Sequence, residues 1–215
     1  LLKYDSHYGD FRGDIGIEGS HLIIEGKKIP YLQEPVITHV PWADFGVNIL
    51  VEASGQKLEG AELKSILADG LTNLVYGRNE DGADTTIIYG TNQNRYIPGK
   101  HKTISASSCT GNAIVPIVDV LLKHVGVDAA HFVSIHPALT EQRVLDVAHS
   151  KFHLGRSALA SIIPTSSGIT TSIEDAFPEL KEKVSSITYR IPTTVVSAID
   201  AHFQLKKKVT TDQIN

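Results

Sequence analysis

Several protein classes are excluded by what this sequence has little of. The 215 residues include one cysteine and no methionine. A single cysteine forms no intramolecular disulfide, so a disulfide-stapled secreted scaffold is excluded. No apolar run approaches the roughly 18 residues that a membrane-spanning helix needs, and the first residues lack the pattern of a signal peptide. We therefore expect a cytoplasmic protein without a membrane partner.

A strong excess of either charge is also lacking. The chain has 20 lysines and arginines against 24 aspartates and glutamates, which gives a net charge of −4. Proteins that bind nucleic-acid phosphates usually carry a basic surface, so we expect no nucleic-acid partner. No metal site is predicted. The chain does not begin with methionine, so the sequence is compatible with its being a piece of a longer protein.

Strand-like and helix-like segments alternate over residues 47–136. We predict strands over residues 47–52, 84–90, 102–106 and 130–136, and helices over residues 58–70 and 109–125. This alternation predicts a largely parallel sheet of the α/β class. Residues 13–20, which contain three glycines, are interpreted as the start of a hairpin whose return strand is residues 20–32.

The pattern changes after residue 160. Residues 171–177 predict a short helix, and residues 184–190 and 193–209 predict two long neighbouring strands of an antiparallel or mixed sheet. We expect an α/β half, residues 1–107, joined to an α+β half, residues 108–215. Clefts between domains are common ligand sites. The dinucleotide-binding fingerprint G-x-G-x-x-G is absent from the sequence.

The single cysteine, Cys109, lies in the small polar stretch SASSCTGN, just ahead of an apolar helical pattern. At a helix start, unpaired backbone N–H groups and the positive end of the helix dipole both stabilise a thiolate. Small neighbours leave room for a substrate, and Ser108 and Thr110 add hydroxyl groups. These features favour a nucleophilic cysteine. The alternative is a buried, inert cysteine.

A nucleophilic thiolate normally works with a neighbouring base or acid, and His136 is the best placed of the ten histidines. It ends the predicted strand 130–136. If that strand and strand 102–106 belong to one parallel sheet, their carboxyl ends bring Cys109 and His136 to the same edge. The alternative is a structural histidine at the end of a strand.

Residues 162–170 and Arg190 are candidates for binding an anionic substrate. Ser167 and Gly168 precede a predicted helix, where backbone N–H groups and hydroxyls form a cradle for an anion. The same residue types also serve as a plain helix cap. Arg190 lies between two strand-like segments, an unusual place for a purely solvating charge.

Taken together, these residues resemble those of the phosphorylating glyceraldehyde-3-phosphate dehydrogenases and the related erythrose-4-phosphate dehydrogenases. The resemblance extends over the whole chain and rests on the ordered motifs SSCTGN, GTNQNRY, HPALTEQRVLD, GRSALASIIPTSSG and RIPTTVVSAID. It implies the later part of a Rossmann-type NAD-binding domain, residues 1–107, joined to the first part of an α+β catalytic domain, residues 108–215. Gly111 stands where the family usually has threonine.

By this resemblance, Cys109 attacks an aldehyde, His136 takes up a proton while hydride passes to NAD, and phosphate then splits the thioester. The implied site residues are Ser108, Thr110, Ser167 and Gly168 for the attacking phosphate, Arg190 and Thr140 for the phosphate of the substrate, and Ser54, Gly55, Gly77 and Asn79 for the cofactor. The choice between NAD and NADP stays open. A homotetramer is implied, because residues 151–161 resemble the family's subunit-contact loop.

Three departures from the family pattern are visible. Leu139 replaces a phosphate-binding threonine, Leu154 replaces an arginine that helps to bind the attacking phosphate, and the sequence YGRN of residues 76–79 replaces a serine–alanine–proline turn. Loss of an arginine–phosphate pair costs about 1.5–3 kcal/mol of binding free energy. We therefore expect weaker phosphorolysis.

Oxidation of glyceraldehyde 3-phosphate, a reaction of glycolysis and gluconeogenesis, is the leading hypothesis. Leu139 also suits the erythrose-4-phosphate branch, which lacks that threonine. A non-catalytic paralogue or fragment that acts as a binding subunit is an alternative of another class. A third class is a cysteine hydrolase or acyltransferase that uses Cys109 and His136 without NAD.

Overall fold

The computed structural model describes residues 2–55, 60–68 and 70–214. The strands are β1 (Tyr4–Asp5), β2 (Gly9–Asp10), β3 (Ile15–Glu18), β4 (His21–Ile24), β5 (Lys27–Pro30), β6 (Ile49–Glu52), β7 (Asn73–Tyr76), β8 (Thr85–Thr86), β9 (Thr103–Ser105), β10 (Val127–Pro137), β11 (Ile163–Thr165), β12 (Val184–Ile191) and β13 (Ala198–Leu205). The α-helices are α1 (Gly60–Ala68), α2 (Cys109–His124), α3 (Ile169–Ala176) and α4 (Thr211–Ile214). Short 3-10 turns are η1 (Ile37–His39), η2 (Trp42–Phe45), η3 (Gln93–Arg95), η4 (Phe152–Gly155) and η5 (Pro178–Leu180).

The first large sheet is parallel, as predicted, and has the order β6–β7–β9–β8. Strand β7, which the sequence reading did not include, occupies a central place, and its Leu74 and Tyr76 are buried with Ile66 and Leu71 in one hydrophobic cluster. The strand predicted over residues 84–90 is confined to the two residues of β8. The helix predicted over 58–70 is α1; its predicted residues 58, 59 and 69 lie outside the described part of the chain.

The second large sheet is mixed and has the order β11–β12–β10–β13. Strand β10 pairs parallel with β12 and antiparallel with β13. The predicted mixed sheet is therefore confirmed, but the prediction that β12 and β13 are neighbours is wrong. The longest strand, β10, lies between them. Its side chains largely alternate between buried and exposed, so one of its faces lines the core.

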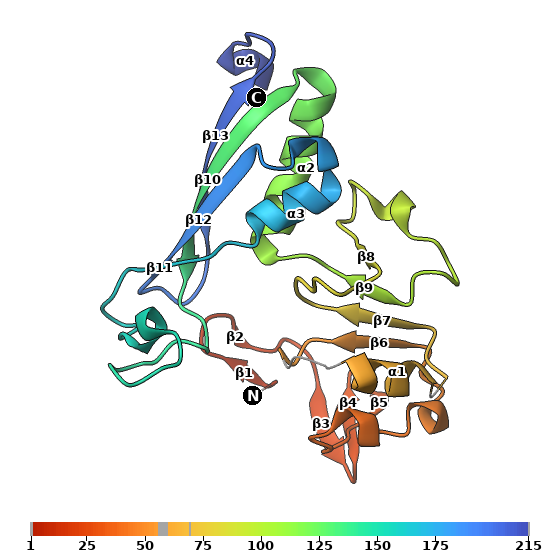
Figure 1. Ribbon diagram of the computed structural model, residues 1–215. Helices are drawn as coiled ribbons and strands as arrows, with labels where there is room; N and C mark the ends of the chain where they lie inside the picture. The colour runs from red at the N-terminus through yellow and green to blue at the C-terminus, as the bar shows by residue number, and fades with distance from the viewer. Residues whose placement is uncertain (1, 56–59, 69, 215) are drawn as a thin grey trace.

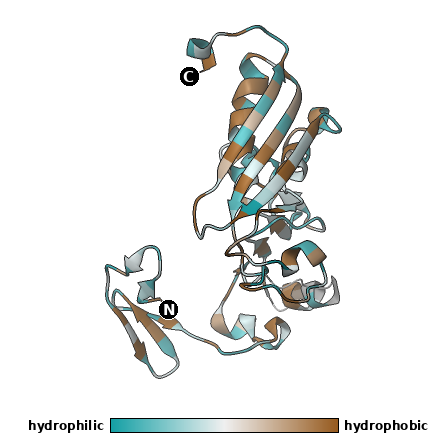
Figure 2. Cartoon of the chain, turned by 90° about the vertical axis from the view of Figure 1, so that its left-hand side faces the viewer, coloured by the Kyte–Doolittle hydropathy of each residue, from teal (hydrophilic) through white to brown (hydrophobic). Residues whose placement is uncertain are grey.

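Helices α2 and α3 cover one face of the mixed sheet, and the other face is open in this chain (Figures 1 and 2). The core between helices and sheet is built from side chains that are almost completely buried, among them Val115, Val118, Phe132, Ile169, Ile173 and Leu180. Phe132 of β10 meets the ring of Phe203 of β13 edge to face, with the ring centroids 5.5 Å apart. This core fixes the start of α2 against the end of β10.

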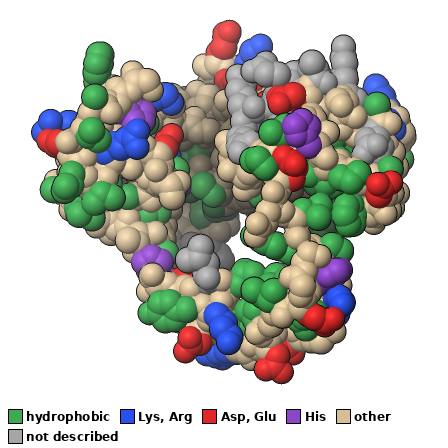
Figure 3. All heavy atoms as spheres, turned by 90° about the horizontal axis from the view of Figure 1, so that it is seen from below, with side chains coloured by type: hydrophobic (Ala, Val, Ile, Leu, Met, Phe, Trp, Pro, Cys, Tyr) green, Lys and Arg blue, Asp and Glu red, His purple; other side chains and the backbone are tan. Residues whose placement is uncertain are grey.

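The amino-terminal residues form two small sheets. Strands β3, β4 and β5 make an antiparallel meander, and β1 pairs with β2. The single return strand predicted over residues 20–32 is wrong, because Glu25 and Gly26 both adopt positive φ (50° and 73°) and turn the chain back between β4 and β5. Seen from below, the molecular surface is hollowed between its lobes (Figure 3).

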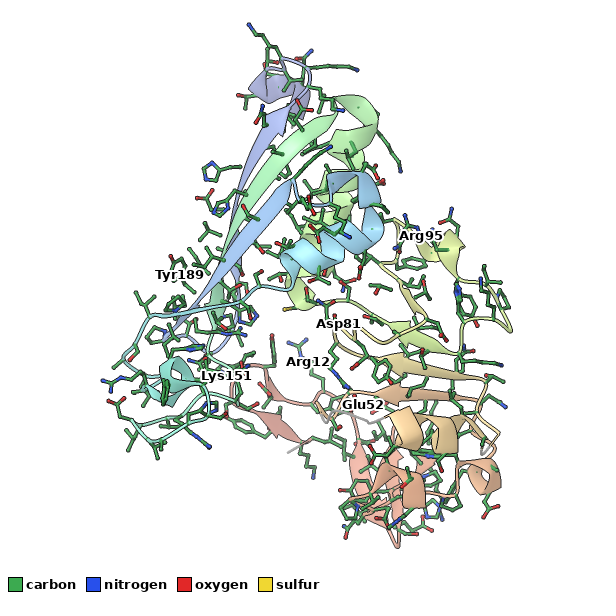
Figure 4. All side chains as sticks on the ribbon, viewed as in Figure 1. Arg12, Glu52, Asp81, Arg95, Lys151 and Tyr189 are labelled. Carbon is green, nitrogen blue, oxygen red and sulfur yellow. The ribbon has the colours of Figure 1, made fainter. Side chains whose placement is uncertain are left out.

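Arg95 of η3 ties the two halves together. Its Nη1 donates to the carbonyl of Asp175 (2.6 Å) and its Nη2 to the carbonyl of Ala176 (2.7 Å), at the carboxyl end of α3. The arginine lies beside that helix end in Figure 4. A cation at the negative end of a helix dipole is stabilising. The predicted division between residues 107 and 108 falls between β9 and α2 and stays a prediction.

Within the ranges that the structure describes, we find no helix whose length and apolar character would allow it to cross a bilayer.

Phe132→Ala is expected to lower the free energy of unfolding by about 3–5 kcal/mol, because the variant leaves a cavity where a completely buried ring now packs. Denaturant unfolding followed by circular dichroism measures the change. The matched control is Tyr89→Ala, since the Tyr89 side chain is 87% exposed and its loss should leave stability nearly unchanged. Equal losses in the two variants would contradict the assignment of the core.

Candidate active site

Cys109 is the first residue of α2, and its side chain is exposed. Two serines form the turn that connects β9 to Cys109. Ser107 adopts a left-handed backbone conformation (φ 64°), which turns the chain sharply before the helix. Ser108 is the N-cap, and its hydroxyl accepts a hydrogen bond from the N–H of Gly111 (2.9 Å). The sulfur therefore lies at the positive end of a sixteen-residue helix, where a thiolate is stabilised.

His136 lies beside the sulfur, with its Nε2 3.5 Å from Cys109 Sγ. The prediction that these two residues meet at one sheet edge is wrong in its reasoning, because β9 and β10 belong to different sheets. Helix α2 crosses from the parallel sheet to the mixed sheet. The two residues meet because α2 packs on the mixed sheet with its amino-terminal end toward the carboxyl end of β10.

The start of α3 lies against the start of α2. Ser172 Oγ accepts a hydrogen bond from Ser107 Oγ (2.8 Å) and donates to the carbonyl of Gly168 (2.7 Å). A Cβ atom added at Gly111 would lie 2.6 Å from Ser172 Cβ and 2.7 Å from Ser107 Oγ. The contact with Ser172 explains why Gly111 replaces the larger residue that is usual in the family.

The residues predicted for the attacking phosphate gather at this junction. Ser167 Oγ accepts from the N–H of Ile169 (3.3 Å), and Gly168 is the N-cap of α3. A Cβ added at Gly168 would lie 3.2 Å from Ser108 Oγ and 2.8 Å from Asn79 Nδ2. Asn79, which the sequence assigned to the cofactor, therefore belongs to the same group of hydroxyl and amide donors as Ser108 and Gly168. Thr110 is buried beside them, 3.4 Å from Ser108 through the two hydroxyl oxygens.

Arg190 of β12 lies on the other side of His136. The parallel register of β10 and β12 pairs His136 with Arg190, so both side chains project from the same face. Burial lowers the pKa of Arg190, and the charges of Glu141 and Cys109 oppose this shift. The Glu141 carboxylate lies 3.8 Å from Arg190 Nη2. Thr140, next to Glu141, is exposed.

The residues predicted to hold the cofactor lie at the carboxyl ends of β6 and β7, the edge at which open parallel sheets bind ligands. Gly55 adopts φ 76°, and a Cβ at Gly77 would lie 3.4 Å from the carbonyl oxygen of Glu52. The two strand ends thus approach closely. Ser54 is held there by its N–H, which donates to Glu52 Oε1 (2.7 Å).

A charged cluster that the sequence reasoning missed lies at this same edge. Arg78 pairs with Glu52, whose side chain is buried, and its Nη2 lies 3.0 Å from Glu80 Oε2. The guanidinium also lies over the ring of Tyr76, 5.0 Å from its centroid, and burial, with the charges of Glu80 and Asp84, raises the pKa of Tyr76 to about 12. The signal in the sequence was a charged residue, Glu52, at the end of an apolar strand-like run; Glu52 is the one buried side chain of β6.

The two leucines that depart from the family pattern have different environments. Leu154 is completely buried in η4. Its side chain is therefore apolar and enclosed at the position where the resemblance implies an arginine. Leu139 is 42% exposed, and its N–H donates to Gln142 Oε1 (3.0 Å). Neither leucine has a polar group that could bind phosphate at these positions.

Comparison with known proteins shows which family this chain is similar to. Residues 108–215 match the family model of the glyceraldehyde 3-phosphate dehydrogenase C-terminal domain, and residues 1–59 match that of its NAD binding domain. Glyceraldehyde-3-phosphate dehydrogenase of Geobacillus stearothermophilus is 33% identical over all 215 residues, and that of Streptomyces coelicolor is 32% identical. Glyceraldehyde-3-phosphate dehydrogenase 1 of Bacillus cereus is 30% identical. The chain spans 64% of the length of these relatives.

Gly111→Ala is expected to lower the free energy of unfolding by about 1–3 kcal/mol, because the added methyl group overpacks the contact with Ser172. Introducing Ser172→Gly into that variant should recover part of the loss, which a double-mutant cycle measures as a coupling energy. Gly82→Ala is the control, since a Cβ there meets nothing within 4 Å. A fully stable Gly111→Ala protein would contradict the packing interpretation.

His136→Gln is expected to slow the alkylation of Cys109 by iodoacetamide at neutral pH about tenfold, because the imidazole next to Sγ helps to hold the thiolate. Mass spectrometry of timed samples gives the rate. His153→Gln replaces an exposed histidine of η4 and should alkylate like the wild type. Equal rates in all three proteins would show that the imidazole does not activate the sulfur.

Proposed function

Because this chain belongs to the glyceraldehyde-3-phosphate dehydrogenase family, we propose that it carries the reactive centre of an NAD-dependent, phosphorylating aldehyde dehydrogenase that oxidises glyceraldehyde 3-phosphate. The observation that carries the proposal is the exposed sulfur of Cys109 at the start of α2, with His136 Nε2 3.5 Å away. In this proposal Cys109 is the nucleophile and His136 is the general acid and base.

The reaction begins when Cys109 gives its proton to His136 Nε2, the thiolate forms a bond to the aldehyde carbon, and His136 Nε2 passes the proton to the carbonyl oxygen. A nicotinamide held at the carboxyl edge of the parallel sheet would supply the acceptor for the hydride of that carbon. His136 Nε2 takes the hydroxyl proton as the carbonyl re-forms, which leaves a thioester on Cys109. An oxygen of inorganic phosphate then bonds to the thioester carbon, the Cys109 thiolate leaves, and the product is an acyl phosphate. Each proton movement needs an imidazole within reach of the sulfur, as His136 is.

Ser54, Gly55 and Gly77 would hold the nicotinamide end of the cofactor at the carboxyl edge of the parallel sheet. The close approach of the β6 and β7 ends at Gly77 leaves backbone rather than side chain on that edge. The cluster at this edge contains two carboxylates, Glu52 and Glu80, against one guanidinium. Its net negative charge suits the cationic ring of oxidised NAD, which supports the fit.

Two anion sites would serve the reaction. Hydroxyl, amide and N–H groups of Ser108, Thr110, Ser167, Gly168 and Asn79 would bind the attacking phosphate at the start of α2 and α3. Arg190, with Thr140 at the edge of the site, would bind the phosphate of the substrate. With Leu154 buried in place of an arginine, the first site relies on neutral donors. We therefore expect a high KM for inorganic phosphate.

A homotetramer is part of this proposal. The loop over residues 138–162 exposes a series of large apolar side chains, namely Val144, Leu145, Val147, Phe152, Leu159 and Ile162. Several large exposed apolar side chains in one loop favour contact with another protein surface.

Erythrose 4-phosphate is the second candidate substrate, because Leu139 leaves the substrate-phosphate site without the hydroxyl group that triose phosphate enzymes usually supply there. Initial rates on the two phosphorylated aldehydes at equal concentration distinguish the two activities.

Purified protein is expected to form NADH from glyceraldehyde 3-phosphate and NAD, and inorganic phosphate should accelerate turnover. Cys109→Ala should abolish the reaction, and His136→Gln should slow it by about 10²–10⁴-fold through loss of the proton acceptor. Absorbance of NADH measures the rate, and Lys123→Leu, which alters an exposed ion pair with Asp119 at the other end of α2, is the control. A turnover rate that does not depend on inorganic phosphate would contradict phosphorolysis. Ester hydrolysis without NAD would favour a cysteine hydrolase.

A further inference from the structure

The Nδ1 atom of His136 has two neighbours that make opposite demands. It lies 2.9 Å from the carbonyl oxygen of Pro137, and Arg190 Nη1 is in hydrogen-bond contact with it. A carbonyl oxygen only accepts a hydrogen bond, and a guanidinium only donates one. Nδ1 therefore satisfies one of these neighbours at a time.

Each choice gives Nε2 a different role toward Cys109. If Arg190 donates to Nδ1, the neutral ring carries its proton on Nε2, which then donates to the sulfur 3.5 Å away. If Nδ1–H donates to Pro137, Nε2 has a free lone pair and can accept a proton. The first arrangement stabilises a thiolate, whereas the second provides the base that the proposed oxidation needs.

Arg190 is poorly satisfied where it lies. Its side chain is 12% exposed, and Glu141, the carboxylate paired with it, is 3.8 Å away. Its buried Nε has no hydrogen-bond partner among the described residues. Burial also lowers the pKa of Arg190. A guanidinium in such surroundings gains more from an oxyanion than from the nitrogen of an imidazole, because bidentate pairs with anions are the stronger bonds.

We propose that Arg190 is a positioning residue that selects the tautomer of His136, and that the anionic group of a bound substrate releases it. In the free protein Arg190 holds Nδ1, and Nε2–H faces the sulfur. An oxyanion draws the guanidinium away; the ring then loses one proton from Nε2 to water and takes one at Nδ1, so it stays neutral. The inference rests on the proposed function in one respect, namely that His136 serves as the proton acceptor.

The test is nitrogen-15 NMR of the full chain labelled at histidine, with His136 assigned from the signal missing in His136→Gln. The free protein should show a protonated Nε2. Glycerol 3-phosphate, which carries the phosphate but no aldehyde, should exchange the positions of the two nitrogen signals. A protonated Nδ1 in the free protein, or no exchange at saturating glycerol 3-phosphate, would overturn the proposal.

Variants separate a positioning role from a structural one. Arg190→Leu should show a protonated Nδ1 with and without glycerol 3-phosphate, whereas Arg190→Lys retains a donor and should restore the protonated Nε2 of the free wild type. Lys123→Leu, at a lysine whose side chain is 64% accessible to solvent, should match the wild type. If Arg190→Leu fails to fold, the lysine variant and the wild-type titration still decide the outcome.

This readout needs neither NAD nor hydride transfer. Exchange of the tautomer in a protein that oxidises no aldehyde would contradict the proposed function alone. Aldehyde oxidation without exchange of the tautomer would contradict the role of Arg190 alone.

Discussion

The unpaired amide groups of the first turn of α2 are the feature on which the rest of the site depends. These groups lie at the end of the helix where Cys109 is the first residue, and the cap by Ser108 satisfies one amide, the N–H of Gly111, while the sulfur stays exposed. The turn that leads to them is strained, because Ser107 adopts a positive φ. The hydrophobic core beneath α2 holds this turn in place, so burial far from the sulfur maintains the geometry at it.

Helices and strands could be predicted from the sequence where apolar residues recur regularly over a long segment, as in α2 and β10. Strand β7 was missed, although its Leu74 and Tyr76 are among the most buried side chains of the described residues; β6 and β9 are no longer than β7 and were predicted. The placement of β9 and β10 in one sheet was also wrong. A helix between two strands has the same sequence pattern whether it returns to its own sheet or crosses to a second one.

Some features of the candidate site follow from the local sequence, and others depend on the assembled fold. Cys109 and its helix start follow from local pattern. His136 was chosen because it ends a strand that was expected to share a sheet edge with Cys109, an argument that the fold overturns, and the family resemblance implied the same residue. The contact of Arg190 with His136 follows from the register of β10 and β12, which no local pattern specifies. Likewise, Asn79 and Gly168 are far apart in the chain, yet a Cβ atom at Gly168 would lie 2.8 Å from Asn79 Nδ2. Contacts of this kind require the assembled fold.

The packing of Gly111 against Ser172 sets the spacing of the two helices. A Cβ atom at position 111 would lie 2.6 Å from Ser172 Cβ, so the missing side chain lets the first turns of α2 and α3 approach closely. The direct hydrogen bond between the hydroxyl groups of Ser107 and Ser172 depends on this approach, so a larger residue at position 111 would separate the donor groups of the two helix starts.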